Sequence, residues 1–294
     1  MAKRCLAQIE GRGLAGGGFS GSDGGDFRPD ATAWAVMALR ATGVAPDRMY
    51  AARDRLVKAQ SPDGSVPVSP DQPKAVWPTA LAALAWHGEA PFADAETRAL
   101  GYLLGSGGIR WQERADEAEM AVDPRLWGWS WVLGTFSWVE PTALALMALT
   151  AGGHATHARA KEAAALLLDR QLAGGGWNFG ATRVYRNVHA ASPEMTGLVL
   201  VAARDHVPRE TVDKSIGYVR GTVGRYMTPL ALGWGLLGLA AWDDAPDGAA
   251  AWLGECLGRQ GLYGPYDTTY LALLVLAAMA HHSGVGPLFS GVRS

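Results

Sequence analysis

The chain has 294 residues and a mass of 31.0 kDa, enough for one large domain with a substantial core. Apolar residues make up 49% of it and charged residues only 18%, a composition that excludes intrinsic disorder. The formal net charge is -2, so the chain lacks the basic field that nucleic-acid binding requires, and we expect no nucleic-acid partner.

The first residues, MAKRCLAQIEGRG, are basic but are not followed by the apolar segment of a secretory signal. The longest apolar runs, 229–242 and 269–280, are shorter than the roughly 20 residues of a membrane-spanning helix and predict buried helices. Cys5 and Cys256 are far apart in the sequence, which argues against a disulfide framework or a cysteine-rich zinc site. We therefore expect a cytoplasmic protein that can touch a membrane only peripherally.

In chain order, one apolar phrase recurs six times: DATAWAVMAL (30–39), WPTALAALAW (77–86), EPTALALMAL (140–149), PEMTGLVLVA (193–202), MTPLALGWGLLGLA (227–240) and YDTTYLALLVLA (266–277). Each copy carries a threonine near its start, namely Thr32, Thr79, Thr142, Thr196, Thr228 and Thr269. A repeat of this length is typical of an array of helix pairs.

A second helical segment that ends in glycine precedes these phrases, most clearly at 54–66, 163–177 and 252–264. This first helix of each pair carries charges on part of its surface, whereas the second is apolar nearly all round. The pattern predicts an outer layer that faces solvent and an enclosed inner layer. Acidic residues, proline and threonine mark the starts of the inner helices, and glycines mark the ends of the outer ones.

Six helix pairs can stack as an open solenoid or close into a ring. The last repeat is as apolar as the middle ones, which favours a ring that covers both ends. We therefore predict an all-α fold, an α/α toroid of six helix pairs, about twelve helices in one domain spanning residues 1–294. Residues 109–131 interrupt the repeat and predict an insertion, either a lid or rim of a cavity or a solvated connector.

Residues 171–177, QLAGGGW, resemble the QxxxGGW phrase, the QW motif, of squalene-hopene cyclases and related terpene cyclases. Gln8, Gln60 and Gln260, each followed by glycines, resemble weaker copies. The inner phrases are also similar to those of protein prenyltransferase beta subunits. The resemblance covers almost the whole chain and implies a class II terpene-cyclase-like protein. Such a protein binds an isoprenoid or other long apolar substrate in a central cavity and cyclises it by proton-initiated carbocation chemistry.

Class II cyclases of this family carry a DxDD or DxDTT sequence at the start of one inner helix, and its central aspartate protonates an alkene. Residues 265–269, PYDTT, resemble DxDTT with proline in the place of the first aspartate. The resemblance makes Asp267 the candidate proton donor, and the same register adds Asp30, Glu140 and Glu194 as candidate catalytic partners. Alternatively, each of the four acids only stabilises the free N–H groups of a first helical turn.

Four aromatic residues, Trp34, Trp138, Trp234 and Tyr270, are candidate substrate-binding residues. Their rings can stabilise a carbocation by cation-π attraction, or they can serve only as packing.

Arg183 and Arg186 follow the GGGWNFG turn and can hold a diphosphate through forked contacts, or lie on a solvated surface. A diphosphate substrate would bring Mg²⁺ with it. We otherwise expect no cofactor and no metal, because Thr268 stands where the related prenyltransferases place a zinc-binding histidine.

Two alternatives to the cyclase remain open. One is a non-catalytic protein of the same fold that binds a hydrophobic ligand or a partner protein. The other is a carbohydrate-active α/α barrel, a class of enzyme that uses paired carboxyl groups. The oligomeric state does not follow from the sequence.

Overall fold

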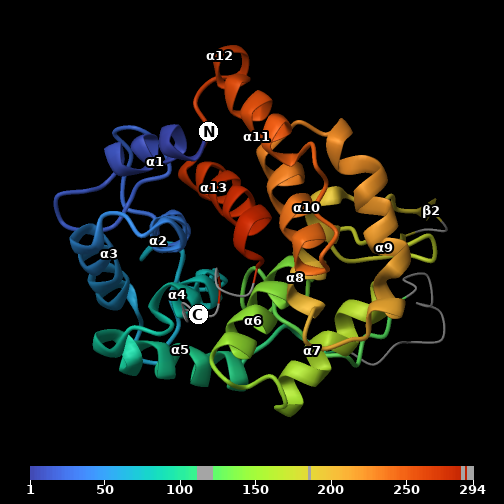
Figure 1. Ribbon diagram of the computed structural model, residues 1–294. Coiled ribbons are helices and arrows are strands. Elements are labelled where there is room, and N and C mark those ends of the chain that lie inside the picture. Colours follow the sequence, from blue (N-terminus) through green and yellow to red (C-terminus); the bar gives the residue numbers. More distant parts are fainter. Residues whose placement is uncertain (111–121, 185–186, 286–288, 290–294) are drawn as a thin grey trace.

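The computed structural model describes residues 1–110, 122–184, 187–285 and 289. Its helices are arranged in a ring with an inner and an outer layer (Figure 1). The exception among the described residues is one antiparallel pair of two-residue strands, β1 (Arg183–Val184) and β2 (Asn187–Val188). The predicted all-α toroid is therefore confirmed.

Successive inner helices contact each other around the ring, and the last contacts the first. The inner helices are α2 (Pro29–Thr42), α4 (Pro78–Trp86), α6 (Val139–Ala151), α8 (Pro193–Ala203), α10 (Pro229–Ala241) and α13 (Thr268–Ser283). The outer helices are α1 (Ala2–Gly11), α3 (Pro46–Ala59), α5 (Ala93–Gly105), α7 (Ala158–Asp169), α9 (Arg209–Thr222) and α11 (Ala249–Gly258). Three short elements complete the described chain: η1 (Ala90–Phe92), η2 (Val223–Arg225) and α12 (Gln260–Tyr263).

Burial differs between the two layers as the sequence predicts. Helix α2 is buried at every position from Pro29 to Leu39, whereas α3 buries only Ala52, Arg53 and Leu56. A helix enclosed on all sides needs apolar residues around its whole circumference, and an outer helix needs a single apolar stripe. Proline in the first turn of α2, α4, α8 and α10 sets the helical φ and gives up an N–H group that has no partner within the helix.

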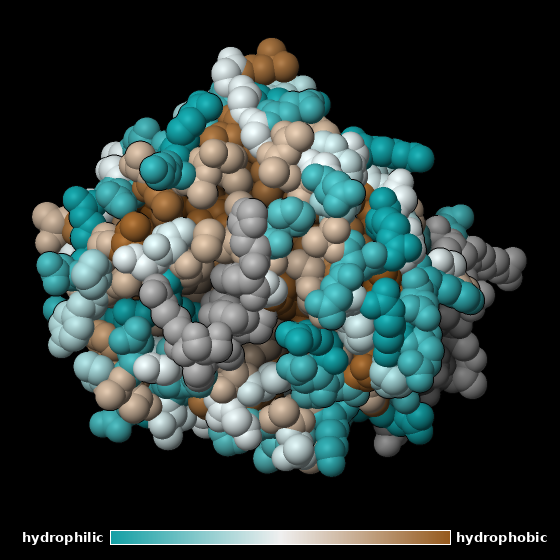
Figure 2. All heavy atoms as spheres, viewed as in Figure 1, coloured by the Kyte–Doolittle hydropathy of each residue, from teal (hydrophilic) through white to brown (hydrophobic). Residues whose placement is uncertain are grey.

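The outer layer is interrupted where the ring closes. Hydrophobic side chains gather over α13, between α1 and α11 (Figure 2), and Ala2, Leu253 and Met279 from these three helices line a hollow there. Among the described residues, no helix has both the length and the apolar character needed to cross a membrane.

The GGGW turn joins an outer helix to the next inner one. Gly175 and Gly176 have φ values of 90° and 87°, in the left-handed region that favours glycine. A Cβ atom on Gly175 would lie 2.6 Å from the backbone of Lys214, so the turn also requires a residue without a side chain. Trp177 is fully buried, and its Nε1 donates to the Leu167 carbonyl at 2.6 Å. The three glycines thus serve the architecture of the ring.

Four of the six repeated threonines fix such turns to the inner helices. The hydroxyl groups of Thr32, Thr79, Thr142 and Thr196 accept hydrogen bonds from the backbone N–H groups of Phe19, Val66, Trp129 and Trp177, at 2.9 to 3.0 Å. Thr228 instead caps its own helix. In the last repeat the threonine that contacts the turn is Thr268 and not Thr269. Its hydroxyl donates to the Ser20 carbonyl at 2.7 Å, and this hydrogen bond connects the end of the ring to its beginning.

Candidate functional site at the starts of the inner helices

Neighbouring inner helices bring their first turns together in two places. At the closure of the ring, Arg28 and Asp30 at the start of α2 meet Asp267 at the start of α13. Farther around the ring, Glu140 of α6 and Glu194 of α8 interact electrostatically. We call these first turns and the loops that lead into them the N-terminal face. All four predicted acids lie on it, but in two separate pairs with different surroundings.

The first pair is neutralised in part by an arginine. Arg28 Nη1 lies 2.7 Å from Asp267 Oδ2, while Arg28 Nε and Nη2 donate to the two carboxylate oxygens of Asp30. Asp30 is 4% exposed, and its hydrogen bonds, together with the charge of Asp267, raise the pKa of Arg28 above its usual range. The remaining oxygen of Asp267, Oδ1, accepts the backbone N–H of Thr269 at 2.9 Å.

These contacts give Asp267 the role of a helix cap and an ion-pair partner. Both of its carboxylate oxygens accept hydrogen bonds, one of them from a guanidinium group. The donor role that the DxDTT-like phrase implies for Asp267 stays a prediction.

The second pair has no such counter-charge among the described residues. Burial, and to a lesser extent the negative charge of Glu194, raise the pKa of Glu140 from its ordinary value near 4.5 to about 7. No hydrogen bond or ion pair from the described part of the chain reaches the Glu140 carboxyl group. Glu140 is thus a partly buried acid that holds its proton close to neutral pH.

Tyr218, which the sequence reasoning did not select, interacts with Glu194 of this pair, and Tyr226 lies near Tyr218. Burial raises the pKa of Tyr218, and the charges of Tyr226 and Glu194 add to the effect. The Tyr218 hydroxyl donates to the Ala191 carbonyl at 2.7 Å, while Tyr226 is 48% exposed. Because Tyr218 lies on the outer helix α9 and Tyr226 follows η2, no signal within their own repeat links them to an inner-helix acid.

Exposed aromatic rings flank Glu140 on the N-terminal face. Trp138, two residues before Glu140, is 37% exposed, and its ring packs against the backbone at Gly180. Phe179 is 54% exposed, and its carbonyl accepts the backbone N–H of Val139 at 3.1 Å. Trp138 is therefore exposed close to this pair, and its substrate-binding role stays a prediction. Phe179, which the sequence analysis did not select, is also exposed there and can contact a ligand at this pair.

The inner-helix aromatic residues occupy a different place. Trp34 and Trp234 are 4% and 3% exposed, and their rings pack edge to face with centroids 5.5 Å apart. Two large rings in mutual contact fill the space between α2 and α10, so here they act as core residues and do not line an open cavity. Tyr270 is half-buried in the first turn of α13 and packs against the same core.

Part of the predicted site lies outside the described residues. Arg186 and positions 111–121 of the predicted lid belong to this part, and for Arg183 only the backbone, in β1, is described. Their roles stay predictions. Within the described ranges, no three histidine, cysteine, aspartate or glutamate side chains come together as a metal site would require.

A separate hollow lies at the opposite ends of α6 and α8. Its volume is about 210 Å³, and its lining includes Met147, Val201, Arg204 and Phe289. Glu140 and Glu194 do not line it. The N-terminal face holds the predicted acids and the exposed rings, so we take it as the candidate site.

Comparison with known proteins identifies relatives by structure alone. No protein-family model matches the sequence, and neither does any curated protein. A family 76 glycoside hydrolase (mannosidase) from Bacteroides thetaiotaomicron matches 97% of both chains with a TM-score of 0.62 and 11% identity.

Two terpene-synthesising enzymes also match. The ent-copalyl diphosphate synthase from Streptomyces platensis aligns with 90% of this chain and 50% of its own, at a TM-score of 0.53 and 17% identity. A type II terpene cyclase from Scytonema, in complex with merosterolic acid A, aligns over 90% and 82%, at 0.51 and 16%. The chain therefore has the α/α toroid fold that class II terpene cyclases share with family 76 glycoside hydrolases. At these identities the likeness establishes the fold and leaves the activity open.

Proposed function

We propose that the protein binds an isoprenoid or similarly long apolar molecule at the N-terminal face and transforms it by acid catalysis, with Glu140 as the proton donor. The observation that carries this proposal is the pairing of Glu140 and Glu194 on neighbouring first turns beside the exposed ring of Trp138, where partial burial raises the pKa of Glu140 to about 7. A general acid works best when its pKa lies near the operating pH. Near pH 7 about half of the molecules hold the proton that the reaction uses.

Glu194 is the natural partner of this acid. Pairs of carboxyl groups with different environments often divide the acid and base roles between them. Here Glu194 belongs to the next inner helix, and its charge acts on Glu140. We propose that Glu194 stabilises the positive charge that develops on the substrate after protonation.

The strength of this acid narrows the chemistry. A carboxyl group with a pKa near 7 is a weak acid, so it suits protonation of an oxygen atom better than protonation of an isolated alkene. We therefore propose a substrate that carries an oxygen function. This differs from the alkene protonation that the DxDTT-like phrase implies for Asp267.

The exposed rings supply the apolar part of the proposed site. Trp138, Phe179 and Tyr226 are each more than a third exposed. Exposed aromatic faces bury apolar ligand surface and attract a developing cation. The fold match with a terpene cyclase holding merosterolic acid A agrees with such a ligand.

A glycan is the competing substrate, because two carboxyl groups beside exposed aromatic rings also suit a glycosidase. The structural match to the family 76 mannosidase over nearly the full length of both chains supports a glycan as the second candidate substrate. The same experiment separates the two substrates.

The test incubates the purified protein with farnesol, geranylgeraniol, farnesyl diphosphate, squalene and α-1,6-mannooligosaccharides, and products are identified by mass spectrometry. We expect a product from at least one isoprenoid. Glu140→Gln should lower its rate about 100-fold or more, whereas the isosteric control Asp267→Asn should lower it less than about 10-fold. Cleavage of the mannooligosaccharides alone, no turnover of any isoprenoid, or equal activity of Glu140→Gln and the wild type would overturn the proposal.

A further inference from the structure

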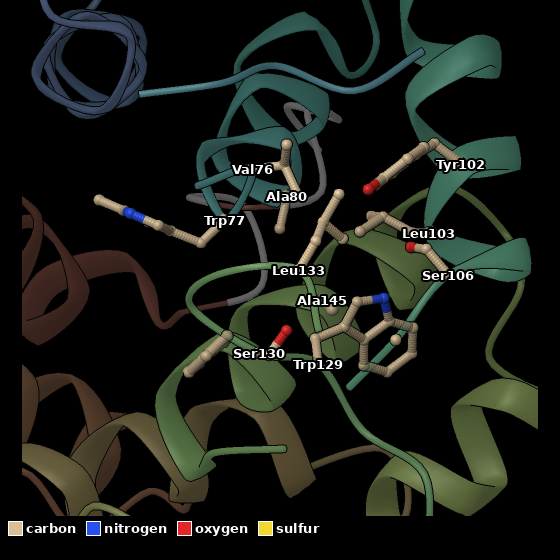
Figure 3. A pocket seen from close by; sticks show the side chains of 12 residues that line it. Val76, Trp77, Ala80, Tyr102, Leu103, Ser106, Trp129, Ser130, Leu133 and Ala145 are labelled. Carbon is tan, nitrogen blue, oxygen red and sulfur yellow. The ribbon is translucent and has the colours of Figure 1, made fainter. Parts of the chain in front are cut away.

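A small pocket lies between α4, α5 and the loop that leads into α6 (Figure 3). Its volume is about 20 Å³, and its wall includes Trp77, Tyr102, Ser106, Trp129 and Leu133. These residues come from three segments that are distant in the sequence. The pocket belongs neither to the acid pair of Glu140 and Glu194 nor to the Arg28 cluster.

Two buried polar groups in this pocket lack a partner. Trp129 is 5% exposed, and neither its Nε1 nor the Oγ of Ser106 has a hydrogen-bond partner among the described residues. In Figure 3 the indole nitrogen of Trp129 and the hydroxyl groups of Ser106 and Tyr102 point toward the middle of the pocket. Buried polar groups are nearly always hydrogen-bonded in native proteins, so two unsatisfied groups facing one space indicate a missing partner there.

Tyr102 adds a third polar group. Burial raises the pKa of Tyr102, which keeps it neutral at physiological pH. The Ser106 hydroxyl lies near enough to oppose this rise, but the two groups do not form a hydrogen bond of normal geometry. The Ser106 hydroxyl therefore remains able to donate to another atom in the pocket.

Arg159 holds the two unpaired groups in place. Its guanidinium carbon lies 4.2 Å from the ring centroid of Trp129 and 3.9 Å from that of Trp127. Arg159 Nη2 also donates to the Ser106 carbonyl at 3.0 Å. One buried cation thus fixes both the ring that carries the Trp129 N–H and the backbone that carries the Ser106 hydroxyl. Binding sites are commonly fixed in advance by such supporting contacts.

The chemistry of the wall defines what can bind. None of the residues that line the pocket is charged, and Arg159 behind its wall is already paired with Glu162, so the pocket offers no free counter-charge to a phosphate or carboxylate group. The Trp129 Nε1 group can only donate, so its partner must be an acceptor. A volume of about 20 Å³ accommodates one water molecule or one ligand oxygen. The rest of a larger ligand would extend past Leu133, which is 38% exposed.

We propose that this pocket binds the uncharged oxygen of an alcohol, ether or carbonyl group at one end of the apolar ligand, with Trp129 and Ser106 as donors. The inference rests on the proposed function for the nature of the ligand's apolar part, but the pocket can be tested without it. It excludes a diphosphate as the group that enters the pocket.

The test titrates ¹⁵N-labelled protein with 1-hexanol, hexanoate and hexane and follows the indole N–H signals. The Trp129 signal is identified by its loss in Trp129→Phe. We expect 1-hexanol to shift this signal, and hexanoate and hexane to leave it in place. Ser106→Ala should weaken 1-hexanol binding about 3- to 10-fold. The control Trp252→Phe, on the outer helix α11, should not change it.

Two results would overturn the inference. One is an equal shift of the Trp129 signal with hexane and 1-hexanol, which would mean that the polar groups do not select the ligand. The other is an unmoved Trp129 signal, which would mean that the pocket only keeps a fixed water molecule. Failure of the proposed function is distinct from both, because isoprenoids would then give no product that depends on Glu140 while 1-hexanol still shifts the Trp129 signal.

Discussion

Arg28 Nη1 lies 2.7 Å from the carboxylate of Asp267, although 239 positions separate the two residues in the chain. The same guanidinium group also holds Asp30, so it joins the first inner helix to the last. The residue that resembles a catalytic acid in the sequence is therefore part of the contact that closes the ring.

Replacement of Arg28 should destabilise this closure. Arg28→Met leaves Asp30, which is 4% exposed, as a buried carboxylate without its partner. Removing one member of a buried ion pair costs about 3–5 kcal/mol, and we expect the lower end because the Arg28 side chain is 43% exposed. Urea unfolding measures the loss. The double variant Arg28→Met/Asp30→Asn should recover part of it; a double variant less stable than Arg28→Met would contradict this account.

The turn threonines provide a second test. The Thr196 hydroxyl accepts the Trp177 N–H at 3.0 Å, and both residues are fully buried. Thr196→Val leaves that N–H group unpaired, which should cost about 1–3 kcal/mol in the free energy of unfolding. Thr269→Val is the matched control, since the Thr269 Oγ1 is buried without a hydrogen-bond partner in the described part of the chain. We expect it to be neutral or stabilising, and equal losses in both variants would count against the assigned role of Thr196.

Stability should depend on pH through Glu140. Its pKa is about 7 in the folded protein and near 4.5 when unfolded, so between these values the folded state binds one more proton than the unfolded state. The free energy of unfolding should therefore fall as pH rises from about 4.5 to 7, by at most about 3 kcal/mol. Above about pH 7 the ionisation of Glu140 should lower the free energy of unfolding no further.

Glu140→Gln removes this loss. As the pH rises from 4 to 8, the free energy of unfolding of the variant should increase relative to that of the wild type. Urea unfolding at a series of pH values measures this difference. Glu194→Gln should produce a smaller gain, because burial outweighs the charge of Glu194 in raising the Glu140 pKa. Identical pH dependence in Glu140→Gln and the wild type would show that Glu140 ionises normally.

The fold could be predicted because its causes are local and repeated. Apolar residues all round one helix of each pair, first-turn prolines and glycine-terminated outer helices lie within single repeats, and they specify a two-layered ring. Even the threonines carried usable information, since Thr32, Thr79, Thr142 and Thr196 all bond the turn that precedes their helix.

The chemistry of the site was harder to predict because it depends on neighbours from other repeats. The sequence register equates Asp267 with Glu140, yet Asp267 is the N-cap of α13 and meets Arg28, whereas Glu140 lies inside the first turn of α6 and meets Glu194. Trp34 appeared suited to line a cavity, but Trp234 packs against it across the ring. The pocket at Trp129 and Ser106 also joins separate segments, so the sequence pattern of no single repeat contains it.

The measurement that most directly tests the central claim is an NMR titration of the Glu140 side-chain carboxyl carbon, assigned by comparison with Glu140→Gln. It requires neither a substrate nor an activity. A midpoint at about pH 7 is the result we predict, because Glu140 is partly buried and lies near the charge of Glu194. A midpoint near 4.5, the ordinary value of a glutamate, would contradict the assignment of Glu140 as the acid of this site.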